Sequence, residues 1–352
     1  MRECNVIIKD KINTIEWDKL LDQSNETTFF SSYHYMDLNN DKKVYFELRS
    51  KSDKLIGGII ARVRGDFPII ENVARSLWVE SAICLDNDVL EQGRYKLYLL
   101  EVLIKYAVSN HFCQVVFNHW SRETLDFTTF DSRINSQKTA TFLIDLSLSE
   151  DKIFSGFSKG HKSSIKKAIK VENISIFVDE KLKYLNEYYF LYKQTQQRAI
   201  KADKKSSMTL HSKEYLERLL RLDGASLHLA LLNNEVVSGA IIVENTNCAI
   251  YYLGASDIDL NRKYSSSNLL QWEIIKWAKN KGIRFYDFGG SPVNPSDTHP
   301  AFGVYRFKKS FGGEYKEYNA PIIIISKVKY WIVTNVIDNR KILRLIKKVL
   351  KY

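Results

Sequence analysis

The alternation of apolar and polar residues predicts two similar series of strands and helices along the chain. In the first series, two apolar runs joined by a short polar turn predict a β-hairpin at 43–49 and 55–63. Leucine, isoleucine and valine at helical spacing predict a helix over 90–110. An apolar run directly after it predicts a strand at 113–118.

The second series repeats this order further along the chain. The pattern predicts a hairpin at 226–232 and 236–244, a third strand at 248–254, a helix at 267–281 and a strand at 284–288. Both hairpins carry glycine inside their second strand. A recurrence of one pattern at a fixed separation indicates duplication of a single unit.

These elements predict an α/β protein of two halves, each a mixed sheet flanked by helices. We expect the first half at 1–155 and the second at 156–325, with a helical insertion near 181–223. Residues 326–352 form a basic C-terminal tail in this prediction. There the apolar residues share one face of an amphipathic helix, and Arg and Lys share another.

Charge changes this picture because it is concentrated. The chain of 352 residues has a net charge of +11. Residues 159–170 hold five lysines and no acid, and residues 327–352 hold eight Lys or Arg against one Asp. Localised positive charge is typical of proteins that contact phosphates, nucleic acid or an anionic membrane surface. The alternative is that these are ordinary solvated helix faces.

Composition also limits the location and the cofactors. The first residues, MRECNVIIKDK, lack the apolar core of a signal peptide, and no apolar run is long enough to cross a bilayer. The four cysteines form no C-x-x-C pair, so neither a zinc site nor a disulfide framework is predicted. We therefore expect a cytoplasmic protein, at most peripheral at the inner face of the membrane, without a metal or a tightly bound cofactor.

A first candidate site precedes the helix at 267–281. Helix N-termini offer free N–H groups and a partial positive charge, which favours a phosphate or pyrophosphate. The alternative is ordinary helix capping by serine. The residues of this predicted phosphate-binding site are Arg262, Lys263, Tyr264, Ser265 and Ser266.

A second candidate site is the end of the strand at 284–288. Active sites of α/β sheets lie beyond the carboxyl ends of strands. Asp287 is a candidate base or positioning group there, and Gly289 and Gly290 open the loop that follows. The alternative for Asp287 is a structural role, either capping this loop or pairing with an arginine.

A third candidate site is the stretch 302–315, FGVYRFKKSFGGEY, in which aromatic residues alternate with cations before a glycine pair. A lysine on a short helix beside a sheet edge could stabilise negative charge during acyl transfer. The alternative is solvated lysines and core aromatics, and spacing alone does not decide between the two. Lys308 is the catalytic candidate here, with Phe307 beside it, and Arg306 is predicted to bind the donor or its phosphates. Tyr305 and Tyr252 complete the predicted pocket with Gly289 and Gly290.

Several of these motifs follow one another in a recognisable order. A strand ending in YYLG is followed by a polar loop, a helix, A-x-x-x-G, a strand ending in YDFGG, and FK-x-x-FGG. This series resembles the C-terminal half of the Fem family of peptidoglycan aminoacyltransferases, part of a superfamily of tandem GNAT-like acyltransferases. Upstream, residues 140–170 resemble the strand and basic helix that join the two halves in that family.

The resemblance implies a function and a role for two residues. Fem proteins transfer an amino acid from aminoacyl-tRNA to an amino group of a peptidoglycan precursor. Lys308 matches the lysine held to stabilise charge at the reacting ester, and Phe307 matches its aromatic neighbour. The expected partners are a peptidoglycan precursor or related envelope glycan as acceptor, tRNA as donor, and an anionic membrane contacted through 327–352.

Two other functions remain open from the sequence. Relatives in the wider superfamily use acyl-CoA, so an acyl-CoA-dependent N-acyltransferase acting on an amino sugar of a surface polysaccharide is the first alternative. The loop NRKYSSS contains no glycine, unlike the pyrophosphate loop of ordinary GNAT enzymes. The second alternative is a non-enzymatic protein that binds RNA or a membrane through its basic segments.

Overall fold

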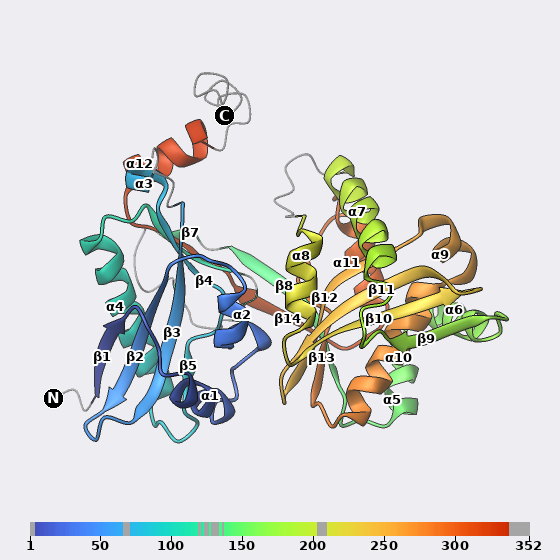
Figure 1. The fold of residues 1–352 in the computed structure, drawn as a ribbon, viewed down its shortest axis with the longest axis horizontal. Coiled ribbons are helices and arrows are strands. Elements are labelled where there is room, and N and C mark those ends of the chain that lie inside the picture. The colour runs from blue at the N-terminus through green and yellow to red at the C-terminus, as the bar shows by residue number, and fades with distance from the viewer. Residues whose placement is uncertain are drawn as a thin grey trace. The chain divides into compact units, whose positions relative to one another are not determined.

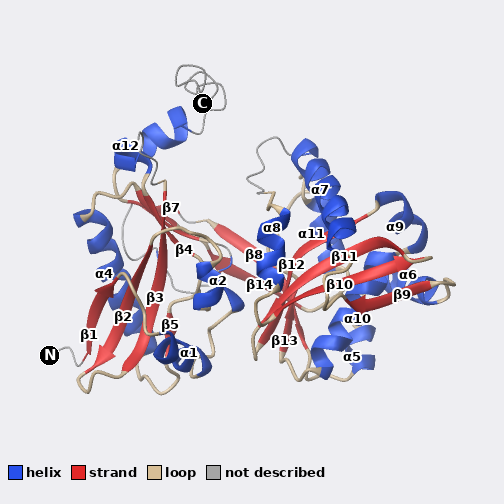
Figure 2. Cartoon of the chain, in the orientation of Figure 1, coloured by secondary structure: helices blue, strands red, loops and turns tan. Residues whose placement is uncertain are grey.

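The chain forms two compact units. The computed structural model describes residues 4–65, 71–118, 120, 122, 127, 134–135, 137–202 and 210–337. Unit 1 comprises Met1–Lys138 and Tyr318–Tyr352, and unit 2 comprises Thr139–Glu317 (Figure 1). Each unit contains a mixed sheet with helices packed against it, as the sequence pattern predicted (Figure 2).

The sheet of unit 1 is mixed because β4 and β6 are parallel, whereas its other neighbouring strands pair antiparallel. Across the sheet the order is β1 (Cys4–Lys9), β2 (Lys43–Ser50), β3 (Leu55–Arg64), β4 (Ser76–Val79), β6 (Gln114–Phe117), β15 (Ile322–Ile324) and β7 (Ile134–Asn135), and β5 (Cys84–Leu85) pairs with β3. The helices are α1 (Thr14–Asp22), η1 (Phe29–Ser31), α2 (Tyr33–Asp37), α3 (Glu71–Ala74), α4 (Gln92–Ser109), α12 (Lys327–Ile332) and η4 (Val333–Ile337).

The sheet of unit 2 is mixed because β12 and β13 are parallel. Its order is β14 (Glu314–Asn319), β8 (Lys138–Asp145), β13 (Phe285–Asp287), β12 (Cys248–Ser256), β11 (Glu235–Glu244), β10 (Ala225–Leu232) and β9 (Ile174–Val178). The helices are α5 (Glu150–Ser155), α6 (Lys159–Ile169), α7 (Leu185–Ala202), α8 (Lys213–Leu220), α9 (Ile258–Tyr264), α10 (Ser266–Asn280) and α11 (Phe302–Lys309). The predicted helical insertion is formed by α7 and α8. The segment 201–207, which the sequence predicts as a polar loop, begins within the last turn of α7, and its residues 203–207 lie outside the described residues.

The strands of the two sheets are arranged in the same spatial order, but one position is filled by strands from different places in the chain. Reading from β1 and from β9, the strands correspond in sequence until the sixth position. In unit 1 that position is filled by β15 from the end of the chain, and in unit 2 by β8, the strand that follows β7. The division of the chain therefore differs from the predicted boundary at residue 155. The prediction assigned β8 to the first half and β15 to the second because it assumed that each half uses consecutive residues.

Glycine in the second strand of each hairpin admits an aromatic side chain. A Cβ at Gly58 in β3 would lie 2.7 Å from the Trp17 ring of α1. A Cβ at Gly239 in β11 would lie 2.5 Å from the Tyr188 ring of α7. Real Cβ atoms do not approach other atoms so closely, so both hairpins need glycine to bring a helix onto the sheet.

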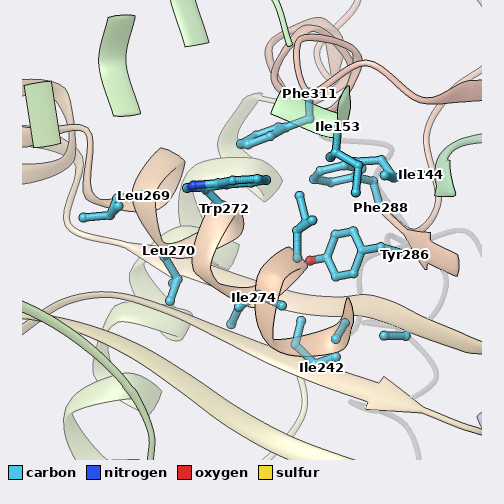
Figure 3. Packing of buried hydrophobic residues seen from close by; sticks show 14 of the residues in the cluster. Ile144, Ile153, Ile242, Leu269, Leu270, Trp272, Ile274, Tyr286, Phe288 and Phe311 are labelled. Carbon is cyan, nitrogen blue, oxygen red and sulfur yellow. The ribbon is translucent and has the colours of Figure 1, made fainter. Parts of the chain in front are cut away.

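The core of unit 2 lies on one face of its sheet. Helix α10 buries Leu270 and Ile274 against strand residues such as Ile242, and Trp272 packs among Phe288 and Phe311 (Figure 3). Helices α5, α6 and α11 contribute side chains to the same cluster. The opposite face is covered by α7 and α8, which contact β10, β11 and β12.

The predicted basic tail is described only at its start. Residues 327–337 form α12 and a π-helical turn, whereas 338–352, which hold most of the basic residues predicted to share one helix face, lie outside the described residues. Among the helices that the structure describes, none is long and apolar enough to cross a membrane.

The position of β15 predicts that a C-terminal residue stabilises unit 1. Ile323 is 4% exposed and pairs with β6 on one side and β7 on the other. We expect Ile323→Ala to lower the free energy of unfolding by about 2–4 kcal/mol, since it leaves a cavity in a packed core. The matched change Ile15→Ala, at an 80% exposed position in α1, should stay within about 0.5 kcal/mol. Urea denaturation measures both; equal effects would contradict the role of β15.

Candidate functional site

The turn after β13 is held by a buried carboxylate. Asp287 is 2% exposed, and its Oδ1 accepts hydrogen bonds from the Gly289 N–H at 2.7 Å and from the Thr141 hydroxyl. The Thr141 Oγ1 also lies 2.9 Å from the Gly289 carbonyl oxygen. Gly289 has φ +73°, a left-handed conformation that glycine adopts without a Cβ clash. Asp287 therefore caps the loop that follows its own strand, which is the structural alternative considered from the sequence.

Lys308 lies buried directly beside this turn. Its side chain is on α11 and the residue is only 7% exposed. Its Nζ donates a hydrogen bond to the Gly290 carbonyl oxygen at 2.7 Å, and it lies 5.9 Å from the centre of the Tyr251 ring. A buried ammonium requires hydrogen bonds or charge partners, because leaving water is otherwise costly. The structure thus brings together Lys308, Asp287, Gly289 and Gly290, from the second and third candidate sites of the sequence.

The C-terminal end of α11 is fixed against the turn between α5 and α6. The Ser158 N–H donates to the Ser310 carbonyl oxygen at 2.8 Å. Gly312 and Gly313 both have positive φ, and a Cβ at Gly312 would lie 2.6 Å from the Gly156 carbonyl oxygen. The glycine pair of the FGG motif therefore allows a close backbone approach that sets the position of α11 and its lysine.

Tyr251 is a site residue that the sequence analysis missed. The β11–β12 pairing shifts register so that Tyr251 faces Ile242 and Leu253 faces Ile241, which leaves Tyr252 as the extra residue of a β-bulge. A Cβ at Gly254 would overlap the Tyr251 hydroxyl, so this glycine makes room for the ring. Burial raises the pKa of Tyr251 to about 12, and its hydroxyl is therefore neutral at physiological pH.

Tyr252, which was predicted to line the pocket, points elsewhere. Its hydroxyl lies 3.5 Å from His211 Nε2, and the His211 ring stacks on Tyr215 of α8. Of the two adjacent tyrosines, Tyr251 is the one whose ring centre lies 5.9 Å from Lys308 Nζ. Tyr252 occupies the bulge and contacts His211, shortly before α8. The alternation of strand residues was visible in the sequence, but it does not say which tyrosine faces the site.

The aromatic residues predicted on α11 support the helix. The Phe307 ring packs 5.5 Å from His161 of α6 and 5.2 Å from Phe311. The Tyr305 ring lies 5.5 Å from Phe142 of β8. Arg306, between them, is exposed. Phe307 and Tyr305 thus fix two sides of α11, and Lys308 follows them on the buried side.

His161 is buried between α6 and α11 and is uncharged at neutral pH. Burial lowers its pKa, and the Phe307 carbonyl opposes that shift only in part. Its Nε2 is buried without a hydrogen-bond partner among the residues that the structure describes. His161 therefore acts as a packing group under Phe307. His299 accepts a hydrogen bond on Nδ1 from the Ala301 N–H at 3.0 Å, just before α11.

The start of α10 is capped by an asparagine. The Asn261 Oδ1 accepts from the Ser267 N–H at 2.8 Å and from the Ser266 hydroxyl at 3.2 Å. Ser265, with φ +56°, forms the left-handed link from α9 to α10. The predicted serines thus belong to a helix junction in which Asn261 supplies the capping oxygen.

The cations predicted at this junction lie on the outside of α9. Arg262 is exposed and lies 3.7 Å from Asp259, and the Lys263 Nζ sits 4.9 Å from the centre of the Tyr264 ring. Arg262 and Lys263 thus lie on α9, whereas Arg306, which was also predicted to bind the donor or its phosphates, lies on α11 with Lys308. Within the described part of the chain, no group of three or more His, Cys, Asp or Glu could hold a metal ion.

The Thr141 hydroxyl predicts a stability effect that can be isolated. Thr141→Val keeps the side-chain shape but removes the hydrogen bonds to Asp287 and Gly289. We expect a loss of about 1–3 kcal/mol in the free energy of unfolding, because buried polar groups lose a partner. Thr139→Val on the same strand is the control, since Thr139 is partly exposed and its hydroxyl makes a long 3.4 Å contact with the Ser291 carbonyl oxygen. Chemical denaturation should separate the two variants; indistinguishable curves would contradict the Thr141 role.

Comparison of the sequence with known proteins finds a family match that begins in unit 2 and ends in the C-terminal part of unit 1. Residues 201–337 match the FemAB family. Lipid II:glycine glycyltransferase of Staphylococcus haemolyticus is 32% identical over 80 residues, which are 23% of this chain and 19% of the relative. The enzyme of the same name from Staphylococcus epidermidis is 33% identical over 76 residues, 22% and 18% of the two chains. The chain therefore matches about a fifth of the length of these relatives.

Comparison of the fold extends over most of the chain. The crystal structure of FemX matches 94% of this chain and 99% of its own at 14% identity, with a TM-score of 0.67. L-PGS from Bacillus licheniformis matches 93% and 98% at 13% identity, with a TM-score of 0.55. A tandem GNAT protein from the clavulanic acid biosynthesis pathway matches 92% and 99% at 11% identity, with a TM-score of 0.51. The chain is therefore similar to the FemAB family over residues 201–337, and over most of its length it shares its fold with these solved structures.

Proposed function

We propose that the protein transfers an aminoacyl group from aminoacyl-tRNA to an amino group of a peptidoglycan precursor or a related envelope glycan. The observation that carries this proposal is the buried Lys308 ammonium, which donates a hydrogen bond to the Gly290 carbonyl oxygen. Both residues lie within the stretch 201–337 that matches the FemAB family. The names of the matched relatives, lipid II:glycine glycyltransferases, support a lipid-linked peptidoglycan precursor as the acceptor.

The proposed reaction is a direct attack of the acceptor amine on the acyl ester. The neutral amine forms the new C–N bond, and the carbonyl oxygen becomes an oxyanion. Collapse of this intermediate breaks the ester C–O bond, and the proton lost by the amine goes to the leaving ribose hydroxyl. The fixed positive charge of Lys308 stabilises the oxyanion, and it is most effective in a site that excludes water. No covalent enzyme intermediate is required.

Asp287 takes a positioning role in this proposal. Its Oδ1 is already occupied by the Gly289 N–H and the Thr141 hydroxyl, which suits a group that holds a turn better than a base that collects a proton. By fixing the turn, Asp287 directs the Gly290 carbonyl at Lys308 Nζ. One of the three N–H bonds of the Lys308 ammonium is used in this way to fix the orientation of its side chain.

The role of Lys308 gives a direct test of turnover. Lys308→Ala should lower the rate of transfer about 10²–10³-fold, the loss typical of removing one oxyanion-stabilising donor. Lys152→Ala, at an exposed lysine on α5, should leave the rate unchanged. The assay follows a labelled amino acid from charged tRNA to a lipid-linked muramyl peptide, with circular dichroism to verify folding.

Two outcomes of this assay would count against the proposal. A Lys308→Ala enzyme that keeps the wild-type rate would remove the chemical role of the lysine. Parallel reactions with labelled acetyl-CoA test the donor, because transfer from acetyl-CoA alone would replace the proposed function with an acyl-CoA-dependent N-acyltransferase.

We further propose that residues 327–352 contact an anionic membrane surface, where a lipid-linked acceptor resides. Val328 and Trp331 are 70% and 61% exposed and lie three residues apart on α12, so they share one face. Lys327 on the same helix is exposed, and the Lys329 Nζ ties the helix to the His111 carbonyl oxygen at 2.7 Å. Exposed Trp with adjacent basic residues is typical of membrane interfaces.

This proposal predicts the behaviour of three variants in a vesicle-binding assay. Deletion of 327–352 should abolish sedimentation with vesicles that contain anionic phosphatidylglycerol, and Trp331→Ala should weaken it several-fold. Phe190→Ala is the control, because it removes a 57% exposed aromatic side chain from α7 in unit 2. Full binding by the deletion variant would show that the tail does not carry the contact.

A further inference from the structure

Three helices with separate clusters of positive charge adjoin one another in unit 2. Helix α6 contacts α9, and it contacts α11 through His161 and Phe307 and through the Ser158–Ser310 hydrogen bond. Each of the three helices exposes Lys or Arg. We define the basic surface by six exposed residues: Lys166, Lys167 and Lys170 at the end of α6, Arg262 and Lys263 of α9, and Arg306 of α11.

The charge of this surface is weakly compensated. Residues 159–170 contain no Asp or Glu. In the described part of the chain, the six residues form one ion pair with an acidic side chain, between Arg262 and Asp259 at 3.7 Å. Both side chains of this pair are exposed, and exposed ion pairs contribute little free energy. Ile165 and Ala168 of α6 are fully buried, so the helix packs through its apolar side and directs its lysines outward.

We infer that the basic surface binds the phosphate backbone of the RNA that carries the acyl group. The inference rests on the proposed function for the identity of the donor. Lys308 lies on α11, the helix that α6 supports through Phe307. An ester at the end of an RNA strand is followed by a phosphate at every nucleotide. A strand whose end reaches Lys308 would therefore carry regularly spaced negative charge away from the site.

The extent of the surface fits a polyanion better than a small donor. Helix α6 alone has 11 residues and is about 16 Å long, and α9 and α11 add cations beside it. The phosphates of coenzyme A lie close together at one end of that molecule, so they would engage only part of this surface. A nucleic-acid strand engages several separated cations at once, and its binding falls steeply with salt.

The exposed apolar residues favour RNA over a membrane at this surface. Ile169 of α6, Ile258 of α9 and Val304 of α11 are 58%, 45% and 53% exposed, but all three are aliphatic and each stands singly on its helix. Tryptophan and tyrosine, which mark membrane interfaces, are not among the exposed large apolar residues of these three helices in the described chain. The exposed tryptophan, Trp331, belongs to unit 1.

A triple charge reversal tests this inference. The variant Lys166→Glu, Lys167→Glu, Lys170→Glu changes three exposed residues that contribute nothing to the core. A hairpin RNA with the sequence of a tRNA acceptor stem, without an amino acid, is the probe, and fluorescence anisotropy measures its binding between 50 and 300 mM salt. We expect the affinity to fall about tenfold or more, and the slope of log affinity against log salt to decrease by about two.

The control reverses three lysines on the other side of unit 2. Lys181, Lys183 and Lys213 are exposed or partly exposed residues of the α7–α8 layer, which covers the opposite face of the sheet. Their change to Glu alters the net charge by the same amount, and it should change the RNA affinity less than twofold. Thermal unfolding verifies that both triple variants remain folded.

Three results would overturn the inference, and they differ from a failure of the proposed function. The first is equal RNA affinity in the two triple variants. The second is loss of binding to anionic vesicles with RNA binding intact, which would assign the surface to a membrane. The third is an unchanged KM for charged tRNA in the α6 variant. If the wild type binds the hairpin through this surface but transfers nothing from charged tRNA, the inference stands and the proposed function fails.

Discussion

A hydrogen bond between a buried ammonium and a main-chain carbonyl joins two elements at the centre of the site in unit 2. Lys308 is removed from water, so its hydrogen bond to Gly290 must be in place for the folded state to tolerate its charge. That carbonyl is placed by the turn after β13, which Asp287 and Thr141 hold from inside the sheet. The strand end and α11 therefore cannot move independently.

The motif around Lys308 divides its work between chemistry and support. The lysine supplies the charge of this motif, whereas Phe307 packs on His161 and the Gly312–Gly313 pair allows α11 to end against the α5–α6 turn. These supporting contacts explain why aromatic, cationic and glycine residues occur together in one short stretch. Electrostatic catalysis also requires a rigidly supported charged side chain, since the charge must not reorganise during the reaction.

Local patterns predicted most of the fold. The hairpins, the α10 helix and the strand ending at Asp287 follow from periodicities that neighbouring residues carry. The strand exchange was not predictable in this way, because β15 has three residues and its pairing partners lie far away in the chain. The site shows the same limit. Lys308 was found through its motif, but Tyr251 was missed because a bulge decides which tyrosine faces the lysine. Thr141 was missed because its partner Asp287 is 146 residues away.

The exchanged strand also affects the order in which the protein can fold during synthesis. The chain leaves the ribosome from its N-terminus, yet the sheet of unit 1 has its sixth strand at Ile322–Ile324. All of Thr139–Glu317 must be translated first, which takes on the order of ten seconds or more at bacterial elongation rates. Until then the edges of β6 and β7 lack their common neighbour, and open strand edges are sites of aggregation. Unit 2, whose sixth strand β8 is made early, has no such delay.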